Sequence, residues 1–399
     1  MTRRRFVRNG ALGCLSLAAA PMINLGQVSL FASETVKVST RAIDLVRSST
    51  VIDMLGLLTL DWAKLFRWQR RTGSFDDSDF RQLERSGVSV FHPAVDTGLK
   101  DEGRAALKWI EGWNLLLGSN VCRLSRVETS SDLLRIPATG RIGVIVGFQN
   151  SNHFHSRADV ATFFRLGQRV SQLTYNERNR LGSGCYVRWD RGLTSFGADI
   201  VDAMNDAGMA IDISHCGERT SLEAVRASRQ PVLITHGNCK ALNPGQPRCR
   251  SDEVIRKMAA GGGVMGITVV RAFVGRSPTI ESLLDHFVHV AKIAGVEHVG
   301  LGSDVDVRAL DPRSGQPLAF YEIEGLDPYA RVFQITDGLL RRGFSRGDVE
   351  LILGGNFRRA LAAIWPSESA DATAREWRRD PFCPVSDPGL PPSIARDSR

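Results

Sequence analysis

Two histidines and one aspartate each stand at the end of a short apolar segment. His215 ends segment 209–215, His236 ends segment 231–236, and Asp304 ends segment 298–304. Such segments are typical of barrel strands, whose carboxyl ends meet on one face. There, imidazole nitrogens can hold a divalent ion and a carboxylate can accept and return a proton. The three residues therefore predict a metal-assisted hydrolytic site, with a structural histidine pair and a turn-capping aspartate as the alternative.

Glycine and arginine residues near these positions fit the same chemistry. Segment 300–306 reads GLGSDVD, and its glycines allow backbone and ligand to approach closely around Asp304 and Asp306. Arg248 lies in the loop that follows His236. Its planar guanidinium can bind a substrate carboxylate through two hydrogen bonds, although Arg248 or Arg250 as a plain surface charge fits the composition almost as well.

Eight apolar, β-branched segments alternate with helical patterns along most of the chain. The segments are 49–53, 88–95, 142–149, 170–175, 209–215, 231–236, 263–270 and 298–304. Residues 196–207 and 282–294 place their apolar side chains at helical spacing. Strand–helix alternation repeated eight times predicts an α/β fold, a (β/α)8 barrel over residues 34–365. The barrel would bring the three chemical residues to one face.

In order along the chain, the motifs resemble the membrane (renal) dipeptidase family of zinc peptidases. They are IDISH at 211–215, TH at 235–236, PR at 247–248, GLGSDVD at 300–306 and GGNFR at 354–358. The resemblance runs from about residue 51 to residue 365. It implies a barrel of the metallo-dependent hydrolase type, with a two-zinc centre that cleaves dipeptides. It also implies that His215 and His236 hold one zinc ion, that Asp304 transfers protons and that Arg248 binds the substrate carboxylate.

The chain departs from this family pattern on the other side of the metal centre. Leu55 and Leu57 stand where the family has a His-x-Asp pair on its first strand. Gln149 stands at the bridging glutamate, and Tyr175 stands at a histidine. Leucine cannot bind a metal ion, and an amide is a poorer bridge than a carboxylate. The sequence therefore indicates one zinc ion in place of two, or none.

Three functions remain open on these residues. The first is a metal-dependent hydrolase of dipeptides or similar small amides with a free carboxylate. Its site would comprise a zinc ion on His215 and His236 with Gln149, Asp304 or water, Asp304 as base and acid, and Arg248, Asn150, Tyr175 and Asn176 around the substrate. The second is a non-catalytic dipeptidase-like binding barrel. The third is a mononuclear hydrolase of N-acyl amino acids.

Composition narrows the partners to small molecules. The chain has 399 residues, 24% of them charged, and a formal net charge of +8. Its arginines are scattered and are not interleaved with aromatic residues, so nucleic-acid binding has little support. Seven cysteines without CxxC spacing do not make a disulfide scaffold. Cys216 and Cys239 are either thiol ligands or small core residues, and a homodimer is expected only by analogy with other barrels.

The two ends of the chain differ from the barrel in composition. Arg3, Arg4, Arg5 and Phe6 precede a weakly apolar stretch, a pattern typical of a twin-arginine export signal. That stretch is too short to span a bilayer. We therefore expect a signal and linker over residues 1–33 and a periplasmic protein; the alternative is a basic tail on a cytoplasmic one. Residues 366–399 form a tail rich in proline and charged residues.

Overall fold

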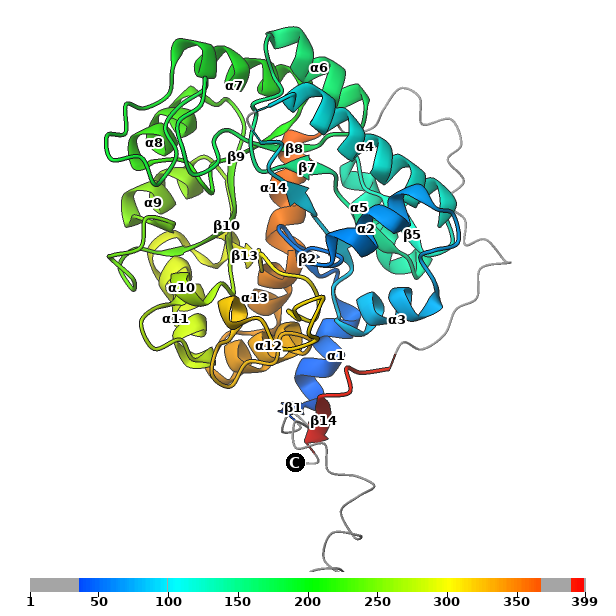
Figure 1. Ribbon diagram of the computed structural model, residues 1–399. Coiled ribbons are helices and arrows are strands. Elements are labelled where there is room, and N and C mark those ends of the chain that lie inside the picture. Colours follow the sequence, from blue (N-terminus) through cyan, green and yellow to red (C-terminus); the bar gives the residue numbers. More distant parts are fainter. Residues whose placement is uncertain (1–35, 99, 367–388, 398–399) are drawn as a thin grey trace, which may run out of the picture.

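The computed structural model describes residues 36–98, 100–366 and 389–397. Its centre is a ring of eight parallel strands, and helices lie around it (Figure 1). In chain order these are β2 (Ile52–Asp53), β3 with β4 (Val90–Phe91, Ala94–Val95), β6 with β7 (Ile142–Val144, Gly147–Phe148), β8 (Val170–Gln172), β9 (Ala210–Asp212), β10 (Val232–Cys239), β12 (Met265–Ile267) and β13 (Val299–Leu301). Each strand pairs with the next, and β13 pairs with β2, so the ring closes. The predicted (β/α)8 barrel is confirmed, and each of its eight strands arises from one of the predicted segments.

Helices surround the strands and follow them in alternation. They are α1 (Thr40–Ser48), α2 (Trp62–Arg70), α3 (Asp77–Arg85), α4 (Glu102–Ser119), α5 (Ser130–Thr139), α6 (Arg157–Arg165), α7 (Ser195–Ala207), α8 (Glu218–Ala227), α9 (Asp252–Ala260), α10 (Arg271–Val274), α11 (Ile280–Ala294), α12 (Arg331–Arg341), α13 (Arg346–Glu350) and α14 (Asn356–Ile364). In α7 the Thr194 side chain caps the first turn, and Gly208 ends the helix at a φ of 73°. The helices predicted at 196–207 and 282–294 are therefore α7 and α11.

Helix α14 closes the amino end of the barrel. The Asn356 amide donates to the carbonyls of Val296 and Val299 at 2.7 and 2.8 Å, beside the start of β13. The Phe357 ring lies so close to Gly300 that a Cβ there would come within 2.3 Å of it. Arg359 donates to the Gly262 carbonyl, which precedes β12. Helix α14 thus packs against the amino ends of β12 and β13, on the face opposite the carboxyl ends of the strands.

Short strands outside the ring hold particular segments in place. Strand β5 (Leu124–Arg126) extends the sheet beyond β6, and β11 (Cys249–Arg250) pairs with the end of β10. Strands β1 (Val36–Ser39) and β14 (Ile394–Asp397) form a separate two-stranded parallel sheet. The predicted signal at 1–33 lies outside the described residues, and of the predicted tail the structure describes residue 366 and residues 389–397.

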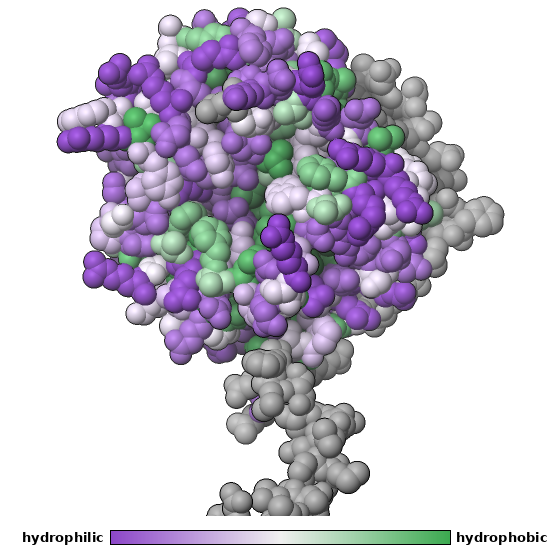
Figure 2. All heavy atoms as spheres, in the orientation of Figure 1, coloured by the Kyte–Doolittle hydropathy of each residue, from purple (hydrophilic) through white to green (hydrophobic). Residues whose placement is uncertain are grey.

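Apolar side chains gather inside the barrel and under its helices. On the face shown in Figure 2, hydrophilic residues cover most of the surface and hydrophobic residues form small patches. Within the described part of the chain, no helix is both long and apolar enough to cross a membrane.

Candidate active site

His215 and His236 meet at the carboxyl ends of two neighbouring strands. His215 follows β9, His236 lies in β10, and their Nε2 atoms are 3.0 Å apart. Both side chains are buried, at 5% and 0% exposure. The predicted convergence of the two imidazoles is present in the structure.

The partners of the two Nδ1 atoms decide which ring nitrogens carry hydrogen. Nδ1 of His215 lies 2.8 Å from the Asn176 amide oxygen, which can only accept, so this Nδ1 is protonated. Nδ1 of His236 lies 2.9 Å from the Thr235 hydroxyl. That hydroxyl already donates to a carboxylate oxygen of Asp212, at 2.7 Å, so Nδ1 of His236 is the donor here as well. In the neutral rings, both Nε2 atoms therefore bear lone pairs, and these face each other.

Burial keeps the two imidazoles neutral. It lowers the pKa of His215 and of His236 well below the usual value, and the positive charge of Arg248 lowers both further. A proton shared between the two Nε2 atoms is therefore disfavoured. Two lone pairs at 3.0 Å repel each other unless a cation lies between them, which is the arrangement of two ligands of one metal ion.

Asp212 and Tyr175 fix the orientation of the two rings. The Asp212 carboxylate at the end of β9 accepts from the backbone N–H groups of Ser214 and Thr235 and from both hydroxyls. This network places Thr235 under His236. On the other side, the Tyr175 ring stacks on His215 with ring centroids 4.4 Å apart and planes 26° apart. Neither histidine can turn without breaking a buried contact.

Arg248 lies directly behind the two histidines. It is 1% exposed, and its terminal nitrogens donate to the backbone carbonyls of Ser214 and His236. Pairing of β11 with β10 holds its loop in this position. The Nε–H group of Arg248 has no hydrogen-bond partner in the part of the chain that the structure describes. Arg248 therefore retains donors for a carboxylate. Arg250 is also buried, and donates to the carbonyls of Cys216 and Pro247.

Asp304 stands at the carboxyl end of β13 in a left-handed backbone conformation, with a φ of 61°. Its N–H group donates to the Leu55 carbonyl at 2.8 Å. Burial raises the pKa of its carboxyl group to about 7, with Asp53 adding to the rise and Arg248 opposing it. The negative charge of Asp304 also contributes to the raised pKa of Tyr175. At neutral pH both protonation states of Asp304 are populated, as a group that accepts and returns a proton requires.

The positions of the missing ligands are apolar or already hydrogen-bonded. Leu55 and Leu57 are 0% and 8% exposed. The Gln149 amide donates to the Ala94 carbonyl at 3.2 Å, on the strand that lies away from β9. Asn150 is fully buried, and its amide oxygen accepts from Thr97 and from the Asn152 N–H group. The structure thus brings His215, His236, Tyr175 and Asn176 together, whereas the Gln149 side chain bonds to β4 and the Asn150 side chain bonds to Thr97 and Asn152.

These contacts test the metal content that the family implies. No group of three His, Cys, Asp or Glu side chains that could hold a metal ion occurs among the described residues. A two-zinc centre therefore does not fit. One ion fits the imidazole pair, because nitrogens on one tetrahedral zinc lie about 3.3 Å apart at Zn–N distances of about 2.0–2.1 Å. Cys216 is fully buried in the hydrophobic core, and its Sγ atom accepts a hydrogen bond from the Thr174 hydroxyl at 3.3 Å, which is the environment of a core residue, one of its two predicted roles.

Three residues of the site were missed in the sequence. Asp212 and Thr235 fix His236, and only their positions at strand ends beside serine and histidine hinted at this. His92 follows β3, is buried, and bonds the Met54 carbonyl through Nδ1 at 2.6 Å. Its Nε2 atom has no hydrogen-bond partner among the residues described. A single histidine before a proline gave no spacing signal for it.

Comparison with known proteins agrees with the family that the sequence motifs resemble. The family described as membrane dipeptidase (Peptidase family M19) matches residues 40–374. Dipeptidase verJ of Clonostachys rogersoniana is 30% identical over 265 residues, which are 65% of this chain and 65% of that protein. Dipeptidase tcpJ of Claviceps purpurea is 28% identical over 248 residues, 61% of this chain and 56% of that protein. The chain thus matches less than two thirds of the length of these curated relatives.

Solved structures share the same architecture. An amidohydrolase from Pseudomonas aeruginosa is 27% identical with a TM-score of 0.67, and the match covers 81% of this chain and 99% of that one. A metallopeptidase from Rhodobacter sphaeroides, solved with a phosphinate mimic of the dipeptide L-Ala-D-Ala, is 17% identical with a TM-score of 0.64, covering 79% and 99%. This second likeness concerns the fold alone. Since the family pattern matches most of the chain and the barrel agrees, the protein belongs to the membrane dipeptidase family, Peptidase family M19.

Proposed function

We propose that the protein hydrolyses dipeptides or similar small amides that carry a free carboxylate, with one divalent ion, zinc in the first instance, on His215 and His236. The observation that carries this proposal is the pair of unprotonated Nε2 atoms facing each other at 3.0 Å. Nothing else in the described site explains why two buried lone pairs should be held so close together. Family membership supports the reaction class.

The chain's own residues supply the remaining steps. The free Nε–H group of Arg248 and its unused terminal donors bind the substrate carboxylate and place the scissile amide beside the histidines. Asp304 accepts a proton from the attacking water and returns it to the leaving amine, because its pKa of about 7 allows both steps near neutrality. Asn176 keeps Nδ1 of His215 protonated, so Nε2 stays available as a ligand. A bound divalent ion would supply Lewis acidity for the carbonyl group.

Metal analysis and assays on purified full-length protein test this proposal. We expect about one equivalent of divalent ion per chain, as two histidines with water allow. Removal of the ion with a chelator should abolish hydrolysis of dipeptides such as L-Ala-D-Ala, and added Zn²⁺, Mn²⁺ or Co²⁺ should restore it. Absence of both bound metal and turnover with all three ions would overturn the proposal. Faster turnover of N-acyl amino acids than of free-amine dipeptides would favour a mononuclear acylase instead.

A non-catalytic binding barrel is the second candidate. It is favoured by the absence, among described residues, of a third protein ligand beside the two histidines. In this case the Arg248 fork alone would hold a carboxylate ligand. Binding of a dipeptide measured by calorimetry separates the two functions. Arg248→Ala should abolish binding under both, whereas His215→Ala should leave it intact only for a pure binding barrel.

We also propose that the protein acts in the bacterial periplasm after export by the twin-arginine route. The arginine pair at the N-terminus supports this, and it lies outside the described residues. Replacing Arg3 and Arg4, the pair that stands two positions before Phe6, by lysine should leave the protein in the cytoplasm, as cell fractionation would reveal. Unchanged fractionation of this variant would argue for the basic-tail alternative.

A further inference from the structure

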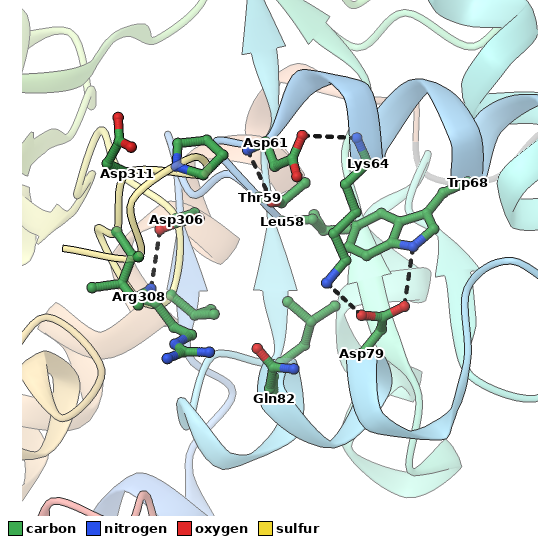
Figure 3. Close-up of a pocket in the computed structure, with 15 residues that line it drawn as sticks. Leu58, Thr59, Asp61, Lys64, Trp68, Asp79, Gln82, Asp306, Arg308 and Asp311 are labelled. Atoms are coloured by element: carbon green, nitrogen blue, oxygen red, sulfur yellow. Dashed lines mark hydrogen bonds and ion pairs between the residues drawn. The ribbon is translucent and has the colours of Figure 1, made fainter. Parts of the chain in front are cut away.

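A second pocket lies beside the barrel mouth, on the side opposite the two histidines. Its volume is about 280 Å³, and its walls come from the β2–α2 connection, from helices α2 and α3, and from the loop after β13 (Figure 3). Strands β2 and β13 are neighbours in the ring, whereas β9 and β10 lie across it. None of the residues that line this pocket belongs to the candidate active site.

Several charges on the pocket wall are already neutralised. Lys64 pairs with Asp79 at 2.6 Å, and the Trp68 indole donates to the other oxygen of Asp79 at 3.0 Å. Both oxygens of Asp306 accept backbone N–H groups, from Leu60, Arg308 and Ala309. These groups build the wall and leave little capacity for a ligand.

The charged groups that can still bind a ligand lie at two opposite edges of the pocket. The Arg308 guanidinium forms no ion pair with any residue in the described part of the chain. In Figure 3 it lies at the lower edge, on the same side as the Gln82 amide. Asp61 and Asp311 lie at the upper edge. One oxygen of Asp61 caps α2 and one oxygen of Asp311 accepts from its own loop, which leaves the second oxygen of each carboxylate available.

We propose that this pocket binds a small zwitterion, an α-amino acid or a short peptide, separately from the active site. The ligand carboxylate meets the Arg308 guanidinium, the ammonium group meets Asp61 and Asp311, and the aliphatic part packs on Leu58 and Leu310. A volume of about 280 Å³ suits a molecule of this size. Amino acids are the products of the proposed reaction, so the choice of ligand class rests on the proposed function, but the site itself does not.

The pocket shares a chain segment with the active site. Asp306 lines the pocket, and Asp304 precedes it by two residues. Leu60 bonds to Asp306, and Gly56 pairs with Val305, so the β2 loop and the β13 loop are joined at the two residues that follow Asp304. A ligand bound between Asp61 and Arg308 would contact both loops and restrict their movement relative to each other. Occupancy is therefore expected to change the turnover rate without competing with substrate.

Calorimetric titration of the full chain with L-alanine tests the proposal, with propionate and ethylamine as single-charge probes. Arg308→Ala should weaken L-alanine binding at least about tenfold, because a charged hydrogen-bond pair is lost. Asp61→Asn, which preserves the helix cap, should weaken it about fivefold. Arg313→Ala is the matched control, since Arg313 lies in the same loop outside the pocket; it should bind normally. Arg248→Ala, which removes the carboxylate-binding group of the active site, should still bind L-alanine at this pocket.

The outcomes are distinguishable from those of the proposed function. Binding lost in Arg308→Ala and kept in Arg248→Ala supports the pocket even if no dipeptide is ever hydrolysed. Binding lost only in Arg248→Ala, binding unaffected by either substitution, or no binding at all overturns it. Propionate or ethylamine binding as tightly as L-alanine also overturns the proposal, because the pocket would then not recognise the carboxylate and the ammonium group together.

Discussion

At the barrel mouth, the imidazole pair beside β9 and β10 and the Asp53 carboxylate at the end of β2 are in opposite states. Beside β9 and β10, two imidazoles present unprotonated nitrogens to each other and to nothing else. Beside β2, every oxygen of Asp53 is bonded, to Ser303, to the Leu55 N–H group and to Arg331. Buried polar groups that are fully paired stabilise a fold, whereas unpaired ones mark a place for a ligand. The difference indicates that the two histidines are held for chemistry, whereas the hydrogen bonds of Asp53 to Ser303, Leu55 and Arg331 contribute stability.

The largest effect should come from the chemical side. His215→Ala removes one of the two Nε2 ligands and should lower kcat/KM at least about 10³-fold, since each tenfold is about 1.4 kcal/mol of transition-state stabilisation. Gln149→Ala, at the end of β7 and two strands from β9, is the control, with an expected loss of less than about threefold, because its amide bonds a neighbouring strand. Equal losses in both variants would erase the contrast between the two sides.

The stability side should respond to loss of its ion pair. Arg331 and Asp53 are both almost fully buried, and an Nη atom of Arg331 lies 3.3 Å from a carboxylate oxygen of Asp53. Arg331→Met leaves the buried Asp53 carboxylate without its counter-ion, so the free energy of unfolding should fall by about 3–5 kcal/mol. Urea denaturation measures this. Arg308→Met, at an exposed arginine two residues from Asp306, should change it by less than about 0.5 kcal/mol.

Leu55 should contribute packing and no chemistry. Leu55→Ala opens a cavity in a fully buried position, and unfolding should become easier by about 2–4 kcal/mol. The folded fraction should keep its specific activity, measured on protein purified by size exclusion. A loss of activity greater than the loss of folded protein would place Leu55 in the chemical half after all.

A smaller effect is expected at Asn176, which sets the tautomer of His215. Asn176→Ala frees Nδ1 and should lower activity about tenfold and weaken metal retention. Asn176→Asp keeps an acceptor and tolerates the left-handed backbone, at a φ of 55°, so it should retain most activity. If both variants behave alike, the hydrogen bond to His215 has no role in the chemistry.

The smallest expected effect is the pH dependence of activity. Because the pKa of Asp304 is raised to about 7, kcat/KM should rise with pH up to about 7 and then level off. The raised pKa of Asp304 affects stability in the opposite direction, because it makes the free energy of unfolding fall as pH rises. Folding favours the protonated form, so the contribution of Asp304 is full below about pH 4 and is lost as pH rises through about 7. Asp304→Asn should flatten this part of the stability profile, as thermal melts across pH would show.

The barrel could be predicted because its strands are apolar on both faces and recur between helices. The residues that fix the orientation of the two histidines were harder to predict from the sequence. His215 and His236 end segments, so their convergence follows from the fold, whereas Asn176 reaches His215 only through a left-handed residue in a loop. Gln149 stands at the right position, but its amide points to Ala94, a choice set by neighbouring strands. Asp53 and Arg331 are 278 residues apart, and no local pattern links them.

The parallel pairing of β1 with β14 has a consequence for how the molecule is completed. Val36 is matched with Ile394 and Ser39 with Asp397, so the first described strand finds its partner only in the last one. During synthesis, β1 cannot form this pairing until residues 394–397 have been made and have left the ribosome. A polypeptide that lacks them would leave the backbone groups on this edge of β1 without a strand partner, and such open edges favour association with other chains.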